Sequence, residues 1–154
     1  MSRYREKIGT SSLDGIFNTT SEEYGKITKN TQKQLQDYAF LNGYSDLYLV
    51  DADYGHVMFS VRKDEDNGRN LLNSNLKNSA LAMVWKKVIE SSTTVISDFS
   101  PYGPADNKEV AFIAHPVTNR SGQKIAVVIL RFNENLISTV TESRKGMGET
   151  GESY

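Results

Sequence analysis

Residues 124–132, KIAVVILRF, form a nearly continuous apolar run. A strand with one solvent face alternates apolar and polar residues, whereas a strand covered on both faces is apolar throughout. The segment EVAFIAHPV (109–117) precedes it, and the intervening TNRSGQ is typical of a hairpin turn. The pattern therefore predicts a central strand of an antiparallel sheet, with a layer packed against each face.

Three further segments have strand character. DLYLVD (46–51) and VMFSVRK (57–63) flank the turn DADYGH and predict a second hairpin, and TVISDF (94–99) predicts a strand between the two hairpins. Short hairpin connections require antiparallel pairing. We therefore expect a five-stranded antiparallel sheet.

A helical stripe precedes the strands. Residues spaced three and four apart predict one long helix that ends at Asn42-Gly43; they are Leu13, Phe17, Thr20, Tyr24, Ile27, Thr31, Leu35, Tyr38 and Leu41. A helix of this length exceeds what one small domain needs, so we expect part of it to pack on a partner chain.

Two more helices are expected. Leu76, Ala80, Met83, Val84 and Val88 have helical spacing in the middle of the chain, and a short helix follows Asn133. The fold class is therefore α+β, with the long helix on one face of the sheet and the middle helix and loops on the other.

Composition excludes several classes of function. The 154 residues include no cysteine, which rules out disulfides, thiolate metal sites and a cysteine nucleophile. The formal net charge of −1 provides no basic face for nucleic acid. The first residues lack the apolar region of a signal peptide, and no apolar run is long enough to span a membrane. We expect either a cytoplasmic protein or a segment of a longer chain.

No catalytic or metal-binding set is recognisable. His56 and His115 lie in different elements, without a serine, aspartate or zinc-motif context. Asp51 begins a segment similar to a calcium loop, but Arg62 stands where the bidentate glutamate is needed. We therefore expect no catalytic residue, no metal and no cofactor.

Polar and aromatic residues instead surround one face of the predicted sheet. A cation, a tyrosine hydroxyl and a carboxylate would suit a small carboxylate or an amino acid. The candidate ligand-binding residues are Arg62, Lys63, Trp85, Asp98, Phe99, Tyr102 and His115, with Lys77 and Arg131 as further cations.

Each candidate also has a purely structural interpretation. Trp85 has the spacing of a core residue, and His115 lies in an apolar strand where a structural histidine is common. Asp98 precedes a turn and could cap the backbone. Arg62 and Lys63 are neighbours in a strand and face opposite ways, so at most one of them would face a pocket.

Taken together, GYSDLYLVDADYGHVMFSV, DNGRNL, DFSPYGPADNKEVAFIAHPV and RKGMGETGESY resemble the extracytoplasmic Cache (PAS-like) sensor domains of bacterial methyl-accepting chemotaxis receptors. Related domains occur in sensor histidine kinases and membrane cyclases. The resemblance covers about residues 35–154. It implies a PAS-like sheet whose ligand lies between the sheet and the segment joining its second and third strands.

The resemblance also implies a function and a setting. The chain would be the periplasmic ligand-binding part of an inner-membrane receptor that senses a small organic acid, such as pyruvate or acetate, or an amino acid. It would form a homodimer through the N-terminal helix. We expect an N-terminal helix over residues 1–42, a sensing core over 43–143 and a tail over 144–154 that leads into the rest of the receptor.

Two other functions remain open. The domain could be a structural or dimerisation module of a sensor kinase or cyclase, without a small-molecule ligand. It could also be an intracellular PAS domain holding flavin, or haem ligated by His56 or His115. For the leading hypothesis, we expect Tyr102→Phe and Asp98→Asn to weaken ligand binding with little loss of fold.

Overall fold

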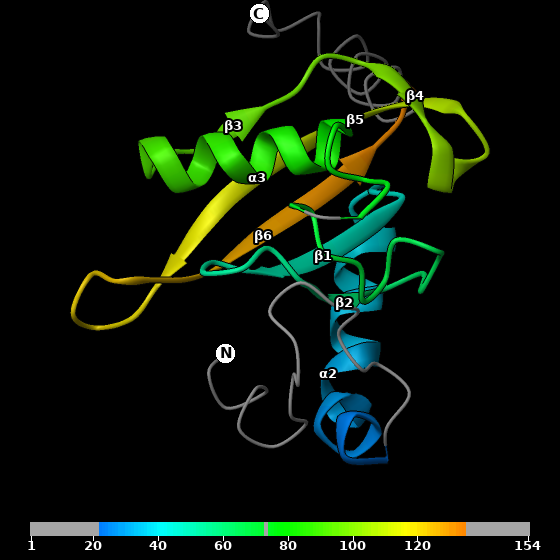
Figure 1. Cartoon of the computed structure of the whole chain (residues 1–154). Coiled ribbons are helices and arrows are strands. Elements are labelled where there is room, and N and C mark those ends of the chain that lie inside the picture. Colours follow the sequence, from blue (N-terminus) through cyan, green and yellow to red (C-terminus); the bar gives the residue numbers. More distant parts are fainter. Residues whose placement is uncertain (1–21, 73, 135–154) are drawn as a thin grey trace, which may run out of the picture.

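The apolar run forms β6 (Lys124–Phe132), the central strand of the sheet in the computed structural model, which describes residues 22–72 and 74–134. The strand order is β2-β1-β6-β5-β3, and every pairing is antiparallel (Figure 1). β1 is Asp46–Asp51, β2 is Val57–Ser60, β3 is Val95–Ile96 and β5 is Lys108–Thr118. Both predicted hairpins are confirmed.

The predicted strand at 94–99 is divided in two. Val95 and Ile96 of β3 pair with Ala114 and Ile113 of β5, while a sixth strand, β4 (Ser100–Tyr102), pairs with β5 one residue out of that register. Residues 97–99 belong to neither strand, and the chain changes its register against β5 between Ile96 and Ser100.

α3 (Ala80–Ser91) covers one face of the sheet. Ser79 caps its start, because its hydroxyl accepts a hydrogen bond from the backbone N–H of Ala82 at 3.1 Å. Leu81, Val84 and Val88 pack with Tyr48 of β1 and Ile129 of β6 in the larger core cluster. The predicted middle helix is confirmed.

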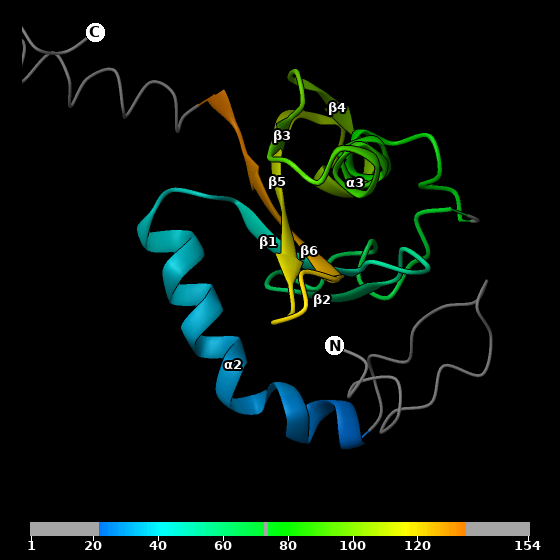
Figure 2. The ribbon, with the colours of Figure 1, turned by 90° about the vertical axis from the view of Figure 1, so that its left-hand side faces the viewer.

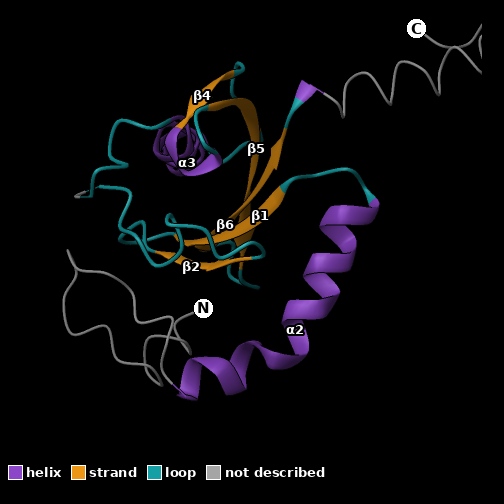
Figure 3. Ribbon diagram, turned by 90° about the vertical axis from the view of Figure 1, so that its right-hand side faces the viewer, coloured by secondary structure: helices purple, strands orange, loops and turns teal. Residues whose placement is uncertain are grey.

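α2 (Glu22–Leu41) covers the other face. In Figures 2 and 3, α2 and α3 lie on opposite sides of β1, β5 and β6. Leu47 and Tyr48 are consecutive in β1, and each is buried in a different core cluster. Apolar layers on both faces explain why β6 is apolar throughout.

The residues of α2 that face the sheet differ from the predicted stripe. Leu35 and the buried Ala39 pack on the sheet, and Gln32 donates a hydrogen bond to the carbonyl of Val61 at 3.2 Å. Tyr38 and Leu41, which belong to the predicted stripe, are 51% and 85% exposed and do not pack on the sheet. Because Ala39 is small, α2 can approach the sheet closely at this position. The helical spacing of apolar residues alone does not reveal this contact.

The α+β, PAS-like fold class is confirmed, with six strands in place of five. The predicted start of the long helix, the tail at 144–154 and all of the C-terminal helix beyond Glu134 lie outside the described residues. The division into 1–42, 43–143 and 144–154 stays a prediction. Within the described ranges, no helix combines the length and apolar character needed to cross a membrane.

Candidate ligand-binding site

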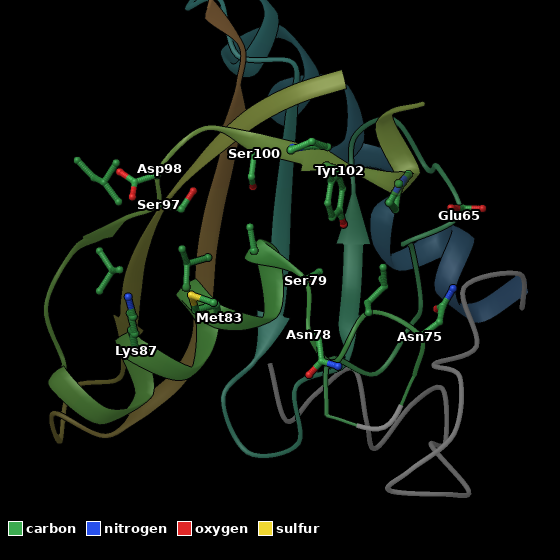
Figure 4. Close-up of a pocket in the computed structure, with 18 residues that line it drawn as sticks. Glu65, Asn75, Asn78, Ser79, Met83, Lys87, Ser97, Asp98, Ser100 and Tyr102 are labelled. Carbon is green, nitrogen blue, oxygen red and sulfur yellow. The ribbon is translucent and has the colours of Figure 1, made fainter. Parts of the chain in front are cut away.

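A groove of about 610 Å³ lies between α3 and the segment that runs from β3 through β4 into the short 3-10 helix η1 (Gly103–Ala105) (Figure 4). Its polar lining residues are Glu65, Asn75, Asn78, Ser79, Lys87, Ser97, Asp98, Ser100 and Tyr102. Leu76, Met83, Val84, Val95, Ile96 and Pro101 are among its apolar ones. Half of the 18 lining residues are polar, whereas the usual small-molecule site is mostly apolar with a few polar groups.

The charged side chains lie toward the ends of the groove. In Figure 4, Asp98 and Lys87 are seen at one end of the labelled side chains, and Glu65 and Asn75 at the other. Between β3 and β4, Asp98 lines the groove while Phe99 packs edge-on against Phe132 of β6, with ring centroids 5.5 Å apart.

Tyr102 forms the wall between this groove and the core. Its side chain is 2% exposed, and its hydroxyl donates a hydrogen bond to Oδ2 of Asp66 at 2.9 Å. Its ring packs edge-on against Phe112, with centroids 5.1 Å apart. Burial and the neighbouring Asp66 raise the pKa of Tyr102 well above its usual value, so the hydroxyl stays a donor.

Behind Tyr102 lies a buried polar network centred on Arg131, whose side chain is 3% exposed. Nη1 of Arg131 donates to the Tyr48 hydroxyl at 3.0 Å, and Nε donates to Oγ of Ser45 at 3.2 Å. Oδ2 of Asp46 lies 4.0 Å from Nη1, and Oδ2 of Asp64 lies 3.5 Å from Nη2. Burial lowers the pKa of Arg131, but Tyr48 and the surrounding carboxylates raise it further, so the guanidinium stays charged.

The two buried carboxyl groups of the network both have raised pKa values. Oδ1 of Asp46 accepts hydrogen bonds from the backbone N–H groups of Leu47, Val61 and Arg62 at 2.7, 3.1 and 3.2 Å. Burial nevertheless raises the pKa of Asp46 to about 6, against the lowering effect of Arg131. Burial also raises the pKa of Asp66, although hydrogen bonds from Tyr48 and Tyr102 favour its ionised form.

Of the predicted ligand residues, the structure brings Asp98 and Tyr102 together on the groove. The side chain of Arg62 pairs instead with Asp64 at 3.1 Å. It lines a second cavity of about 250 Å³ together with Arg131 and Lys108. Lys63 is exposed, has a positive φ of 56°, and lines neither cavity.

The remaining predicted residues also lie away from the groove. Trp85 is 4% exposed and belongs to the core beneath α3, with its indole N–H donating to the carbonyl of Asp51 at 3.0 Å. Phe99 packs on Phe132, and His115 is exposed, with Nδ1 2.7 Å from the hydroxyl of Thr94. Trp85, Phe99 and His115 line neither cavity.

Sequence reasoning missed several groove residues. Lys87 is one turn beyond Met83 on α3, and Ser79 caps the same helix, so helical spacing from the cap could have found both. Glu65 stands in an acidic loop that has the composition of a solvated turn, and no sequence signal places that loop at the end of the groove.

The histidines do not suggest a haem site. His56 is 1% exposed, and its Nδ1 lies 3.6 Å from Oδ2 of Asp51, while His115 is on the surface. Among the described residues there is also no group of three side chains suited to hold a metal ion.

Comparison with solved structures identifies the fold. The sensor domain of the Vibrio cholerae histidine kinase DctB matches with a TM-score of 0.58 at 14% identity, over 86% of this chain and 46% of that one. The ligand-binding domain of the Pseudomonas aeruginosa PAO1 amino acid chemoreceptor PctC, in complex with GABA, matches with a TM-score of 0.51 at 16% identity, over 88% of this chain and 56% of that one.

This chain therefore spans about half the length of these two sensor domains. No protein-family model matches the sequence, and no curated protein matches it. Identities of 14% and 16% establish the fold alone. The resemblance noted in the sequence is confirmed at that level: the chain has the Cache, PAS-like fold of extracellular sensor domains.

Proposed function

We propose that this chain is the extracytoplasmic ligand-binding part of a membrane receptor for chemotaxis or related signal transduction. The observation that carries the proposal is the groove beside α3, in a fold shared with the DctB and PctC sensor domains. The function is binding rather than catalysis. The receptor would be anchored in the inner membrane, and this part of it would lie in the periplasm.

The charges on the groove favour an amino acid over a simple carboxylate such as acetate or pyruvate. Asp98 and Glu65 are carboxylates, and Lys87 is the one cationic side chain that lines the groove in the described part of the chain. A simple carboxylate bound at Lys87 would also meet the like charge of Asp98 at the same end of the groove. An amino acid offers an ammonium group to Asp98 and a carboxylate to Lys87.

A thermal-shift series tests this proposal. Alanine, GABA, glutamate, acetate, pyruvate and propionate would each be added to the folded chain, because a ligand that binds the native state raises its melting temperature. We expect at least one amino acid to raise it and the simple carboxylates to do so less. If none of these compounds raised the melting temperature at millimolar concentration, the proposal would be rejected.

Two variants locate the binding site. We expect Asp98→Asn to weaken binding of the best amino acid by about tenfold or more, since it removes the charge that pairs with the ammonium. Lys87→Met should weaken it through the carboxylate. Glu90→Gln is the matched control, because Glu90 is exposed on the same helix but does not line the groove. Equal affinity in all three variants would exclude this groove.

The proposal includes a homodimer formed through the N-terminal helix. Tyr38, Phe40 and Leu41 are 51%, 47% and 85% exposed near the end of α2, and such apolar residues are suited to an interface. The same residues support the alternative function, a dimerisation module without a small-molecule ligand. The thermal-shift series separates the two functions, because that module would respond to none of the compounds.

A further inference from the structure

The Arg131 network connects the candidate groove with the places where the chain enters and leaves the sheet. Tyr102 lines the groove and donates to Asp66. Ser45 immediately precedes β1, and its backbone N–H donates to the carbonyl of Arg131 near the end of β6 at 2.7 Å. A change of charge inside the network would therefore act on the groove wall, on the start of β1 and on the end of β6.

The network has more buried negative than positive charge when all of its acids are ionised. Asp46 and Asp66 are both 0% exposed, and Arg131 is the buried cation beside them. Arg131 also faces Asp64 at 3.5 Å, although Asp64 is paired with Arg62 at 3.1 Å from the exposed side. One guanidinium thus serves two fully buried carboxyl groups, and burial of the remaining charge is costly.

Two carboxylate oxygens of the network have no hydrogen-bond donor within the part of the chain that the structure describes. Oδ2 of Asp46 and Oδ1 of Asp66 are buried and have no hydrogen-bond partner among the described residues. A proton on either carboxyl group would remove one buried charge and convert an unsatisfied acceptor into a donor. Charge balance therefore favours the uptake of one proton by this pair of acids.

The other groups around Asp46 and Asp66 do not neutralise the excess negative charge of the two acids. Tyr48 of β1 and Tyr102 of β4 contribute neutral hydroxyls, and Arg62 contributes its backbone N–H to Asp46 while its side chain pairs with Asp64. Lys108 of β5 lines the second cavity with Arg131 and Asp64, is exposed, and forms no ion pair with either buried acid among the described residues.

We propose that Asp46 and Asp66 together form a proton-binding site and that the domain responds to external pH through it. The proton comes from solvent and binds one carboxylate oxygen of the pair. Once one acid is neutral, Arg131 is no longer attracted to that group, so its position shifts toward the remaining carboxylates, and Tyr102 and Ser45 adjust with it. Only the exposure of this site to external pH depends on the proposed function; the proton uptake does not.

The raised pKa values of both acids support this proposal. Burial disfavours the charged carboxylate of each acid and so favours its protonated form. Asp46 has a pKa of about 6, so uptake would occur over mildly acidic conditions. The position of the pair away from the groove lining separates this site from the site of the small ligand.

Nuclear magnetic resonance of protein labelled with carboxyl-¹³C aspartate tests the proposal without any ligand. We expect one carboxyl group of the pair to titrate with a midpoint between about pH 5 and pH 7, against about 3.9 for an ordinary aspartate. The backbone amide signals of Tyr102 and Ser45 should move with the same midpoint. Titration of both carboxyl groups below about pH 5 would overturn the proposal, as would Tyr102 and Ser45 signals that do not follow the titration.

Variants assign the titration to the site. Asp46→Asn keeps an oxygen for the three backbone donors, and we expect it to abolish the step or move its midpoint by about one pH unit or more; Asp66→Asn should do the same. Asp37→Asn is the control, because Asp37 is exposed on α2 and lines neither cavity. A step unchanged in both network variants would overturn the proposal. If neither variant folded, the assigned titration of the unmodified chain would decide.

Discussion

The hydroxyl of Tyr102 and the carboxylate of Asp66 form a buried hydrogen bond of 2.9 Å between residues 36 positions apart in sequence. Tyr102 faces the groove on one side and the Arg131 network on the other, with the guanidinium carbon of Arg131 6.0 Å from its ring centroid. Tyr102 is therefore a structural residue as well as a candidate ligand contact, which changes the expectation that its hydroxyl can be removed with little loss of fold.

Replacement of Tyr102 by phenylalanine should lower the free energy of unfolding by about 1–3 kcal/mol, because it leaves the buried Asp66 carboxylate with one donor fewer. Urea unfolding at pH 7.5 would measure this change. Tyr38→Phe is the control, since Tyr38 is 51% exposed and its replacement should change stability by less than about 0.5 kcal/mol. Equal free energies of unfolding for Tyr102→Phe and the unmodified chain would show that the Tyr102–Asp66 hydrogen bond contributes nothing to stability.

Stability should also depend on pH through Asp46. The pKa of Asp46 is about 6 in the folded chain, against 3.8 for an ordinary aspartate. The folded state therefore binds the proton more tightly than the unfolded state does. The stabilisation is fully present below about pH 4 and is lost as pH rises through about 6. The difference corresponds to at most roughly 3 kcal/mol at 1.36 kcal/mol per pKa unit.

Urea unfolding between pH 4 and pH 7.5 would measure this loss by comparing the unmodified chain with Asp46→Asn. Other acids contribute to both proteins, so the difference between the two curves isolates Asp46. We expect the difference in stability to shift in favour of Asp46→Asn as pH rises. Parallel curves would contradict a raised pKa at Asp46.

The sheet was predictable from sequence because the apolar runs and turn residues of its strands are contiguous, and an apolar run indicates which strand is buried. The apolar run of 124–132 identified the central strand, and the turns at 52–56 and 118–123 identified both hairpins. The break between β3 and β4 was not predictable, because it depends on register against β5. The same limit applied to α2, where Ala39 rather than Tyr38 or Leu41 faces the sheet.

The candidate site was predictable only where its residues are contiguous in sequence. Asp98 and Tyr102 share one segment, and both line the groove. The network behind them joins Asp46, Asp66 and Arg131 from three distant parts of the chain. Arg131 was a candidate because it stands in the apolar run 124–132, whereas Asp46 and Asp66 look like ordinary surface charges in their own sequence context. Long-range pairing of buried charges has no local signal, so neither Asp46 nor Asp66 was a candidate.

Trp85 has the structural role that its helical spacing also allowed. Its indole N–H bonds the carbonyl of Asp51, and its ring would lie 3.3 Å from a Cβ added at Gly55. We expect Trp85→Phe to destabilise the chain by about 1–3 kcal/mol in urea unfolding, through the lost hydrogen bond and the smaller ring.

Affinity at the groove should be unchanged in Trp85→Phe, since Trp85 does not line it. Isothermal titration with the amino acid that gives the largest thermal shift would measure this. Asp98→Asn is the comparison that should lose affinity without a comparable loss of stability, because Asp98 is exposed. A loss of affinity in Trp85→Phe of the size seen in Asp98→Asn would place Trp85 in the site after all.

The end of α2 provides the test of the homodimer. Leu41 is 85% exposed and contributes little to the core of its own chain, so Leu41→Glu should leave the melting temperature of the monomer nearly unchanged. In a dimer formed through α2, the same change would bury a carboxylate at the interface, and we expect at least a tenfold weaker association by analytical ultracentrifugation.

Gln34→Glu is the control, because it adds the same charge at an exposed position earlier on the helix. Equal association of the unmodified chain and both variants would exclude the end of α2 from the interface, and a monomer at all concentrations would refute dimerisation by this part of the receptor.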